Sequence, residues 1–258
     1  MARQFEGKVA LITGASSGIG RATALAFSAE GARVALGARR SAECEELVRE
    51  IQKSGGDAIF VQTDVSKAAD CERLVNATVD KWGKLDIAFN NAGIEGPNMI
   101  STPDYPEEAW DAVIDINLKG VYLSMKYEIP HMAKHGKGAI VNMSSVAGLI
   151  GGPIGIAYYA SKHGVIGVTK AAAIEWAKSG VRVNAVCPAV IETPMAERIF
   201  GGMDPAPLVA LHPIGRFGVP EEVARTVLFL CSDQASFITG VALPIDGGLA
   251  GYFSTGTR

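Results

Sequence analysis

The 258-residue chain has few cysteines and no long apolar run near its start, and both features exclude protein classes. The first apolar run covers only Val9–Ile12, which is too short for a signal-peptide core or a membrane span. The four cysteines form no CxxC pair, which argues against a disulfide framework or a zinc site. We therefore expect a cytoplasmic protein with free thiols, no membrane partner and no bound metal.

The chain also lacks an excess of positive charge. It carries 24 Lys and Arg residues against 27 Asp and Glu residues, for a formal net charge of -3. Nucleic-acid-binding proteins present a basic stripe to the phosphate backbone, so we expect no nucleic-acid partner. Apolar residues are abundant instead, since 48% of the chain is hydrophobic and a further 30 residues are glycine. This composition excludes a mostly disordered chain and favours strands buried on both faces.

Short apolar runs alternate with longer amphipathic segments along the whole chain. The predicted strands are Lys8–Thr13, Arg33–Ala38, Ala58–Gln62, Leu85–Asn90, Gly138–Met143, Val181–Val186 and Val241–Ile245. The predicted helices are Ile19–Glu30, Ala42–Lys53, Lys67–Trp82, Glu107–Asn117, a further helix ending near Met132, Tyr158–Lys178 and Glu221–Leu230. Strands and helices that alternate in this way form βαβ units. We therefore expect one α/β domain over residues 1–258, a Rossmann-type doubly wound parallel sheet of about seven strands with helices on both faces.

A glycine-rich turn lies between the first predicted strand and the first predicted helix. Its sequence, TGASSGIG over Thr13–Gly20, has the spacing GxxxGxG and lacks the Lys-Ser/Thr pair of a P-loop. Glycines at this place let the backbone approach a pyrophosphate, whose charge then lies at the helix N-terminus. The turn predicts a dinucleotide-binding site.

The end of the second predicted strand indicates which dinucleotide is bound. NAD sites usually place Asp or Glu about 20 residues beyond the glycines, to hold the ribose 2′-hydroxyl. At that distance this chain has Ala38, followed by Arg39 and Arg40. A charge-assisted bond from either arginine to a 2′-phosphate is worth about 1.5–3 kcal/mol. The sequence therefore favours NADP(H) and leaves NAD(H) as the alternative.

Two Tyr-x-x-x-Lys pairs place both side chains on one helical face. One is Tyr122 with Lys126, inside a predicted helix, and no polar residue is placed opposite it. The other is Tyr158 with Lys162, which follows a glycine-rich loop, while Ser144 and Ser145 end the preceding strand. Because the carboxyl ends of parallel strands face the ligand crevice, the second pair is the stronger catalytic candidate.

In these motifs the chain resembles the short-chain dehydrogenases/reductases, of the YxxxK type with a TGxxxGxG cofactor motif. The resemblance covers essentially the whole chain. It rests on TGASSGIG, Asp64-Val65, NNAG at 90–93, Asn117, Ser145, YYASK at 158–162, the segment 188–193 and Asp246-Gly247-Gly248. One departure is Ala189, where the family often has glycine, and its methyl group would slightly narrow the nicotinamide side.

The resemblance implies a role for each matched residue. Tyr158 would be the acid/base, Ser145 would orient the substrate oxygen, and Asn117 would hold a water that links Lys162 to solvent. Lys162 would also bind the nicotinamide ribose, and an ammonium about 5 Å from Tyr158 would lower the phenol pKa by roughly 2 units. Asp64 and Val65 would hold the adenine, Asn90, Ala92 and Gly93 the adenosine ribose side, and Ile191 and Thr193 the carboxamide. The full expected cofactor set is Gly14, Ser16, Ser17, Gly18, Ile19, Gly20, Arg39, Arg40, Asp64, Val65, Asn91, Ala92, Gly93, Tyr158, Lys162, Pro188, Ile191 and Thr193.

The activity we expect is hydride transfer between nicotinamide and a ketone or secondary alcohol. The expected substrate pocket, from Ile94–Asn98, Val146–Ile156 and Glu192–Arg216, is rich in apolar residues and suggests a carbonyl reductase of hydrophobic ketones. The loop of about residues 189–217 precedes the last helix as a substrate loop and candidate lid. By resemblance, helix faces around Asn117–Met132 and Tyr158–Lys178 would form a homotetramer interface.

Two alternatives stay open. A 3-oxoacyl-carrier-protein reductase would need a basic docking patch near the cleft, for which Lys119 and Lys126 are candidates. A non-catalytic NADP-binding regulator would keep the fold without turnover, but the presence of both Tyr158 and Lys162 favours an enzyme. An enoyl reductase would usually separate its Tyr and Lys by more than YxxxK, so the expected target is a carbon–oxygen bond.

Overall fold

In the computed structural model, which describes residues 3–251, a seven-stranded sheet forms the centre of the molecule. All neighbouring strands are parallel, in the order β3-β2-β1-β4-β5-β6-β7. The strands are β1 (Val9–Thr13), β2 (Arg33–Ala38), β3 (Ala58–Gln62), β4 (Ile87–Asn90), β5 (Gly138–Met143), β6 (Val181–Pro188) and β7 (Ala242–Ile245).

The sheet is covered on both faces because its strands are apolar on both faces. In β1, the side chains of Ala10 and Ile12 pack into one hydrophobic cluster, while those of Val9 and Leu11 pack into another. This alternation is the two-residue repeat of a strand, and all five residues of β1 are buried. A continuous apolar run is what a parallel sheet between two helix layers requires.

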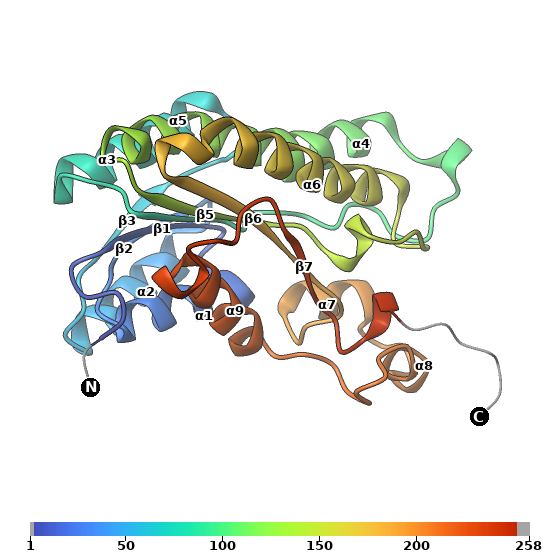
Figure 1. The fold of residues 1–258 in the computed structure, drawn as a ribbon. Coiled ribbons are helices and arrows are strands. Elements are labelled where there is room, and N and C mark those ends of the chain that lie inside the picture. Colours follow the sequence, from blue (N-terminus) through green and yellow to red (C-terminus); the bar gives the residue numbers. More distant parts are fainter. Residues whose placement is uncertain (1–2, 252–258) are drawn as a thin grey trace.

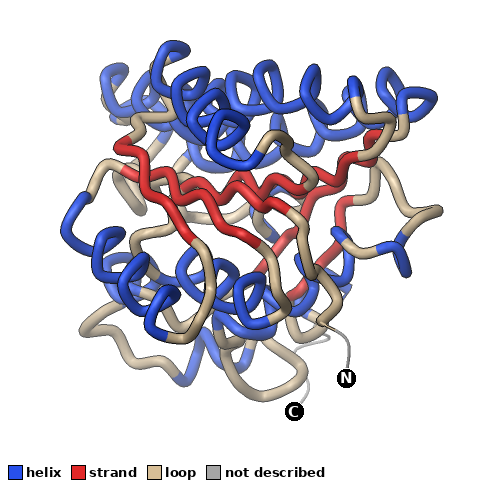
Figure 2. Tube along the Cα trace, turned by 90° about the vertical axis from the view of Figure 1, so that its left-hand side faces the viewer, coloured by secondary structure: helices blue, strands red, loops and turns tan. Residues whose placement is uncertain are grey.

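The helices form one layer on each side of the sheet (Figures 1 and 2). One layer contains α3 (Ala68–Trp82), α4 (Glu107–Ile114), α5 (Gly120–Lys134) and α6 (Ile156–Trp176). The other contains α1 (Gly18–Ala29), α2 (Ser41–Lys53) and α9 (Pro220–Cys231). Two short helices, α7 (Pro194–Phe200) and α8 (Ala206–Ala210), lie beside the second layer, near β7. Over residues 3–251, no helix combines the length and apolar character needed to span a membrane.

The strand order confirms the predicted doubly wound α/β fold. The chain moves outward from β1 to β3, then returns to the other side of β1 with β4 and continues to β7. Ligands in such sheets bind where this order reverses, outside the carboxyl ends of the strands. Here that place is the crevice beyond Thr13 of β1 and Asn90 of β4.

Most element boundaries differ from those expected by one or two residues, and three differences affect the site. The helix expected to reach Asn117 ends at Ile114, and a π-helical segment, Asp115–Lys119, joins it to α5. Helix α6 begins at Ile156, two residues before Tyr158. The expected loop of residues 189–217 contains α7 and α8, whose seven and five residues are too short for a clear helical repeat in the sequence.

Candidate active site

A cavity of about 760 Å³ lies at the carboxyl ends of the strands. The expected residues that line it are Gly14, Ser16, Ser17, Gly18, Ile19, Arg39, Arg40, Asp64, Val65, Asn91, Ala92, Gly93, Ser145, Tyr158, Lys162, Pro188, Ile191 and Thr193. Two expected residues, Gly20 and Asn117, do not line it. The cavity therefore brings together most of the site residues that the sequence predicts, from segments far apart along the chain.

The glycine-rich turn leaves an open cradle at the start of α1. Gly14 and Gly18 have φ angles of 66° and 54°, which L side chains rarely adopt. A Cβ atom on Gly14 would lie 2.8 Å from Cα of Ala92, so this position also requires glycine for close approach. Ser17, the N-cap of α1, makes no side-chain capping bond, so it leaves the first-turn N–H groups of α1 to another acceptor. This geometry fits a dinucleotide pyrophosphate.

Side chains from β1 and the loop after β4 hold this cradle in place. The Thr13 hydroxyl accepts hydrogen bonds from the backbone N–H groups of Asn91 (3.0 Å) and Ala92 (3.2 Å). The Asn91 side-chain amide donates to the carbonyl oxygens of Thr13 (3.0 Å) and Gly14 (3.1 Å). These bonds join β1 and β4 at the point where the strand order reverses, and so fix the floor of the cavity.

Asn90 lies elsewhere, and its expected place on the ribose side was wrong. It is buried, and its amide donates to Glu128 Oε2 and Asn142 Oδ1, both at 3.0 Å. Asn90, the last residue of β4, points toward α5, whereas Asn91, which follows the strand, lines the cavity.

Arg40 follows β2 as the N-cap residue of α2, beside the glycine-rich turn. Its guanidinium donates to the hydroxyl oxygens of Ser16 (2.8 Å) and Ser17 (2.7 Å), and it forms an ion pair with Glu43 at 3.4 Å. The exposed Arg39 also lines the cavity, and no ion pair involves it among the described residues. Two cationic side chains and two hydroxyls therefore meet at this end of the cavity.

Tyr158, Ser145 and Lys162 converge in the middle of the cavity, and all three are buried. The Lys162 ammonium donates to the Met143 carbonyl at 2.9 Å and stands 5.5 Å from the centre of the Tyr158 ring. The Ser145 hydroxyl accepts from the Ala147 N–H at 3.2 Å, which holds it at the carboxyl end of β5.

The pKa of Tyr158 is higher than the sequence suggested. Burial raises it to about 12, the Ser145 hydroxyl acts against this by a hydrogen bond to the phenol, and the Glu95 charge adds to it. This net rise is opposite to the lowering expected from the Lys162 charge, because that expectation left out the free-energy cost of burying the phenolate. Burial also lowers the pKa of Lys162 to about 8, since the ammonium loses water as well.

Asn117 lies in the π-helical segment, beside Lys162 and outside the cavity lining. Its amide donates to the Ile94 carbonyl (2.9 Å) and the Ser161 hydroxyl (3.2 Å), and its oxygen accepts from the Ile94 N–H (2.8 Å). A Cβ on Gly93 would lie 3.2 Å from the Asn117 oxygen and 3.7 Å from the Lys162 nitrogen. Asn117 therefore fixes the loop after β4 beside Lys162.

The other half of the cavity is mainly apolar. Of the expected pocket residues it contains Ile94, Val146, Ile150, Ile154 and Met195, whereas Ile156 does not line it. Lining residues that were not singled out are Tyr159, Ile199, Phe200, Leu208, Leu211, His212 and Leu249. Most of these lie within the expected loop of residues 189–217. The apolar side chains among the glycines and prolines of that loop were the sequence feature that could have identified them as pocket residues.

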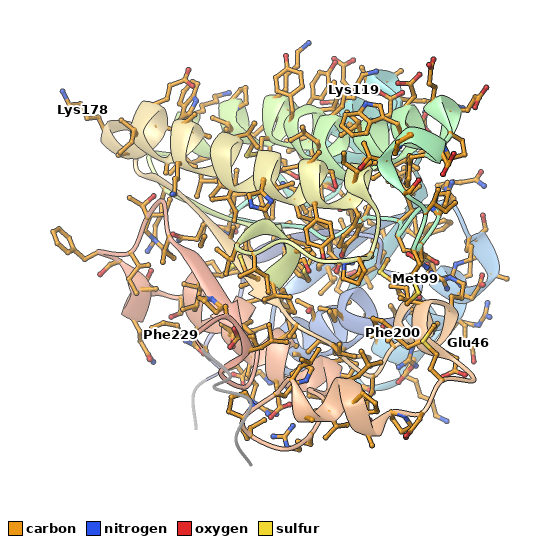
Figure 3. The ribbon with its side chains drawn as sticks, turned by 90° about the vertical axis from the view of Figure 1, so that its right-hand side faces the viewer. Glu46, Met99, Lys119, Lys178, Phe200 and Phe229 are labelled. Carbon is orange, nitrogen blue, oxygen red and sulfur yellow. The ribbon has the colours of Figure 1, made fainter. Side chains whose placement is uncertain are left out.

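The candidate docking lysines lie away from the cavity. Lys119 forms an ion pair with Asp115 at 3.0 Å, and Figure 3 shows it on the outer side of the upper helix layer. Lys126 stands over the Tyr127 ring at 5.4 Å, and neither lysine lines the cavity. The rival Tyr122 is 51% exposed, so the Tyr122–Lys126 pair contributes nothing to this site.

Comparison with known proteins shows the family. The family model described as enoyl-(acyl carrier protein) reductase matches residues 14–250. A cyclohexanol dehydrogenase of an Acinetobacter species is 46% identical over 247 residues, covering 96% of each chain. A 3-oxoacyl-acyl-carrier-protein reductase of Thermotoga maritima is also 46% identical, over 95% of this chain and 99% of the relative.

Solved structures agree in fold over nearly the full length. The structure of levodione reductase has a TM-score of 0.93 at 37% identity and covers 96% of this chain and 100% of its own. A 3-ketoacyl-acyl-carrier-protein reductase from Brucella melitensis, solved with NADH, has a TM-score of 0.89 at 40% identity, covering 95% and 99%. As the sequence predicts, the chain belongs to the short-chain dehydrogenase/reductase family and is an NAD(P)-dependent oxidoreductase acting on CH–OH or carbonyl groups.

Proposed function

We propose that the protein is a carbonyl reductase of hydrophobic ketones, able to run in reverse on secondary alcohols. The observation that carries this proposal is the convergence of Tyr158, Ser145 and Lys162 between a glycine cradle and an apolar half-cavity. The cradle fits a dinucleotide, and the apolar half fits an uncharged substrate. The activity named for the Acinetobacter relative, on cyclohexanol, supports the same substrate class.

The nicotinamide cofactor, when bound, supplies or accepts the hydride. The residues proposed to hold it are those of the cradle, Arg39 and Arg40 at the adenosine ribose, Asp64 and Val65 at the adenine, Lys162 at the nicotinamide ribose, and Ile191 and Thr193 at the carboxamide. Arg39 and Arg40 support a preference for NADP(H), because their charges suit a 2′-phosphate. NAD(H) is the alternative, and the Brucella neighbour was solved with it.

The protein's own groups handle the substrate oxygen and its proton. Ser145 would hold the carbonyl oxygen by a hydrogen bond, and Tyr158 would donate its phenolic proton to that oxygen. Because burial raises the Tyr158 pKa to about 12, the phenol carries at neutral pH the proton that ketone reduction requires. Asn117, beside Lys162, would hold the water through which the proton is replaced.

A substrate screen tests this proposal. Purified protein would be assayed with cyclic, aromatic and aliphatic ketones, and with the matching alcohols, using NADPH/NADP and NADH/NAD. A 3-oxoacyl thioester would be included both free and on its carrier protein. We expect the highest kcat/KM with an uncharged hydrophobic ketone and NADPH. A strong preference for the carrier-protein substrate would replace the proposal with a 3-oxoacyl-carrier-protein reductase, and absence of any turnover would favour a regulator.

We further propose a single domain over residues 1–258 that assembles as a cytoplasmic homotetramer. Exposed apolar side chains on two helices support the assembly, because Tyr122 on α5 is 51% exposed and Ile174 on α6 is 78% exposed. The cytoplasmic location is supported by the cysteines, all of which are buried free thiols. Light scattering on the eluted protein tests the assembly, and a monomer at micromolar concentration would contradict it.

A further inference from the structure

An ion pair crosses the cavity between two segments that are far apart in the sequence. Arg198 on α7 donates from Nε to Glu95 Oε1 at 2.6 Å and from a terminal nitrogen to Glu95 Oε2 at 3.1 Å. Glu95 belongs to the loop after β4, 103 residues earlier, and both side chains line the cavity. Figure 3 shows the two segments on the same side of the molecule, marked by Met99 and Phe200. A two-point contact of this kind fixes orientation as well as distance.

Helix α7 has little else to hold it over the cavity. None of its residues is fully buried, and only Met195, Ala196, Ile199 and Phe200 are half-buried, so side-chain packing holds it only in part. At its start, the Thr193 hydroxyl accepts from the Ala196 N–H, and Thr193 lies against the Gly18 turn. Met195, Ile199 and Phe200 of the helix nevertheless line the apolar half-cavity, so the helix must be held in place for that half to be closed.

The two partners differ in their surroundings. The side chain of Glu95 is only 16% exposed, whereas that of Arg198 is 57% exposed. Arg198 holds the Glu95 carboxylate in its ionised form, and the pKa of Glu95 is lowered although burial acts to raise it. The carboxylate is thus a shielded negative charge inside the active-site cavity, and its only compensating cation among the described residues comes from α7.

We propose that Glu95 and Arg198 are positioning residues for the carbonyl reaction: their ion pair holds α7 over the substrate half of the cavity and neutralises a carboxylate that lines the same cavity as Tyr158. This inference rests on the proposed function, because it takes Tyr158 as the acid/base. Both the affinity for the ketone and the pKa of Tyr158 would then depend on the Glu95–Arg198 contact.

The electrostatic part follows from the groups that face Tyr158. Lys162 stands 5.5 Å from its ring centre, and Ser145 hydrogen-bonds its hydroxyl. Glu95 and Tyr159 line the same cavity as Tyr158, and Arg198 is paired with Glu95 there. The Glu95 charge raises the Tyr158 pKa, and Arg198 opposes that charge from α7. Removing Glu95 should therefore lower the Tyr158 pKa, whereas removing Arg198 should raise it. Both substitutions nevertheless break the same ion pair.

The first test measures the position of α7 in the ligand-free protein. In Glu95→Gln and Arg198→Gln, we expect amide hydrogen exchange of residues 195–200 to become faster than in the unchanged protein. The double variant Glu95→Arg with Arg198→Glu restores a pair of opposite charges, so exchange should slow again. The matched control is Arg21→Gln, which breaks an Arg–Glu pair between α1 and α2, outside the cavity lining. Unchanged α7 exchange in both single variants would overturn the positioning role.

The second test uses steady-state kinetics with the ketone and alcohol identified by the screen. Both single variants should raise the ketone KM by about three- to tenfold, and the charge-swapped variant should lower it again. The rise of alcohol oxidation with pH should move to lower pH in Glu95→Gln and to higher pH in Arg198→Gln. Shifts in the same direction would refute the electrostatic role. If the unchanged protein turns over no carbonyl compound, the proposed function fails, while the exchange measurement still decides the position of α7.

Discussion

A carboxyl group in the helix-covered core, Glu128 on α5, allows a sharp prediction about stability. Its side chain is fully buried, Oε2 accepts from the Asn90 amide at 3.0 Å, and Oε1 has no hydrogen-bond partner in the described structure. Burial raises its pKa to about 8, and the bond from Asn90 lowers it only in part. Glu128 is therefore an uncharged carboxylic acid at neutral pH in the folded protein. We predict that Glu128→Gln stabilises the protein at and above neutral pH.

The size of the effect follows from proton linkage. The folded protein keeps the Glu128 proton up to about pH 8, whereas the unfolded chain loses it near the ordinary value of 4.5. The unfolded state therefore binds fewer protons between these values, and the contribution of Glu128 to stability falls as pH rises through this window. With 1.36 kcal/mol per pKa unit, the loss reaches about 3 kcal/mol at pH 7 relative to pH below 4. Glutamine keeps the oxygen that accepts from Asn90 and carries no proton to lose.

Urea unfolding of both proteins at a series of pH values tests this prediction. Other groups also titrate, so the informative quantity is the difference in unfolding free energy between Glu128→Gln and the unchanged protein at each pH. That difference should grow by about 3 kcal/mol between pH 5 and pH 8. A difference that stays constant with pH would show that Glu128 has the same pKa in both states, and would refute the reasoning.

Two further predictions concern the cofactor end. Arg39→Ala should raise the KM for NADPH about ten- to a hundredfold more than the KM for NADH, because only NADPH offers a 2′-phosphate. Equal increases in steady-state kinetics would remove the NADP preference. Gly14→Ala should destabilise the fold by about 1–2 kcal/mol from its positive φ alone, with more from the close approach of Ala92. Thermal unfolding and fluorescence titration with NADPH would measure it, and unchanged values of both would contradict the assigned cradle.

Much of the fold, and the gathering of the candidate site residues around one cavity, was predictable because several signals in the sequence agree. Strands such as Val9–Thr13 are buried on both faces, so they appear as unbroken apolar runs. The candidate residues follow the ends of different strands, and a parallel sheet brings those ends to one edge. The positive φ of Gly14 and Gly18 explains why the turn after β1 is rich in glycine.

The errors come from interactions that local patterns do not contain. Asn90 and Asn91 are the same residue type in adjacent positions, and only the direction of the strand decides which one faces the cavity. The Tyr158 pKa depends on burial by segments that lie far away in the sequence. Helices α7 and α8 are short and have no fully buried residues, so the sequence does not show the repeat of apolar residues that predicts a helix. The Glu95–Arg198 pair spans 103 residues and could not be inferred from spacing.

The measurement that tests the central claim most directly is turnover by Tyr158→Phe, combined with cofactor binding. The substitution removes only the hydroxyl that we propose to carry the proton, in a side chain that is otherwise buried. We predict that NADPH binds with unchanged affinity by fluorescence titration, while kcat for the preferred ketone falls by at least about a hundredfold. Retention of normal turnover by Tyr158→Phe would contradict the account, because the proton would then come from another group.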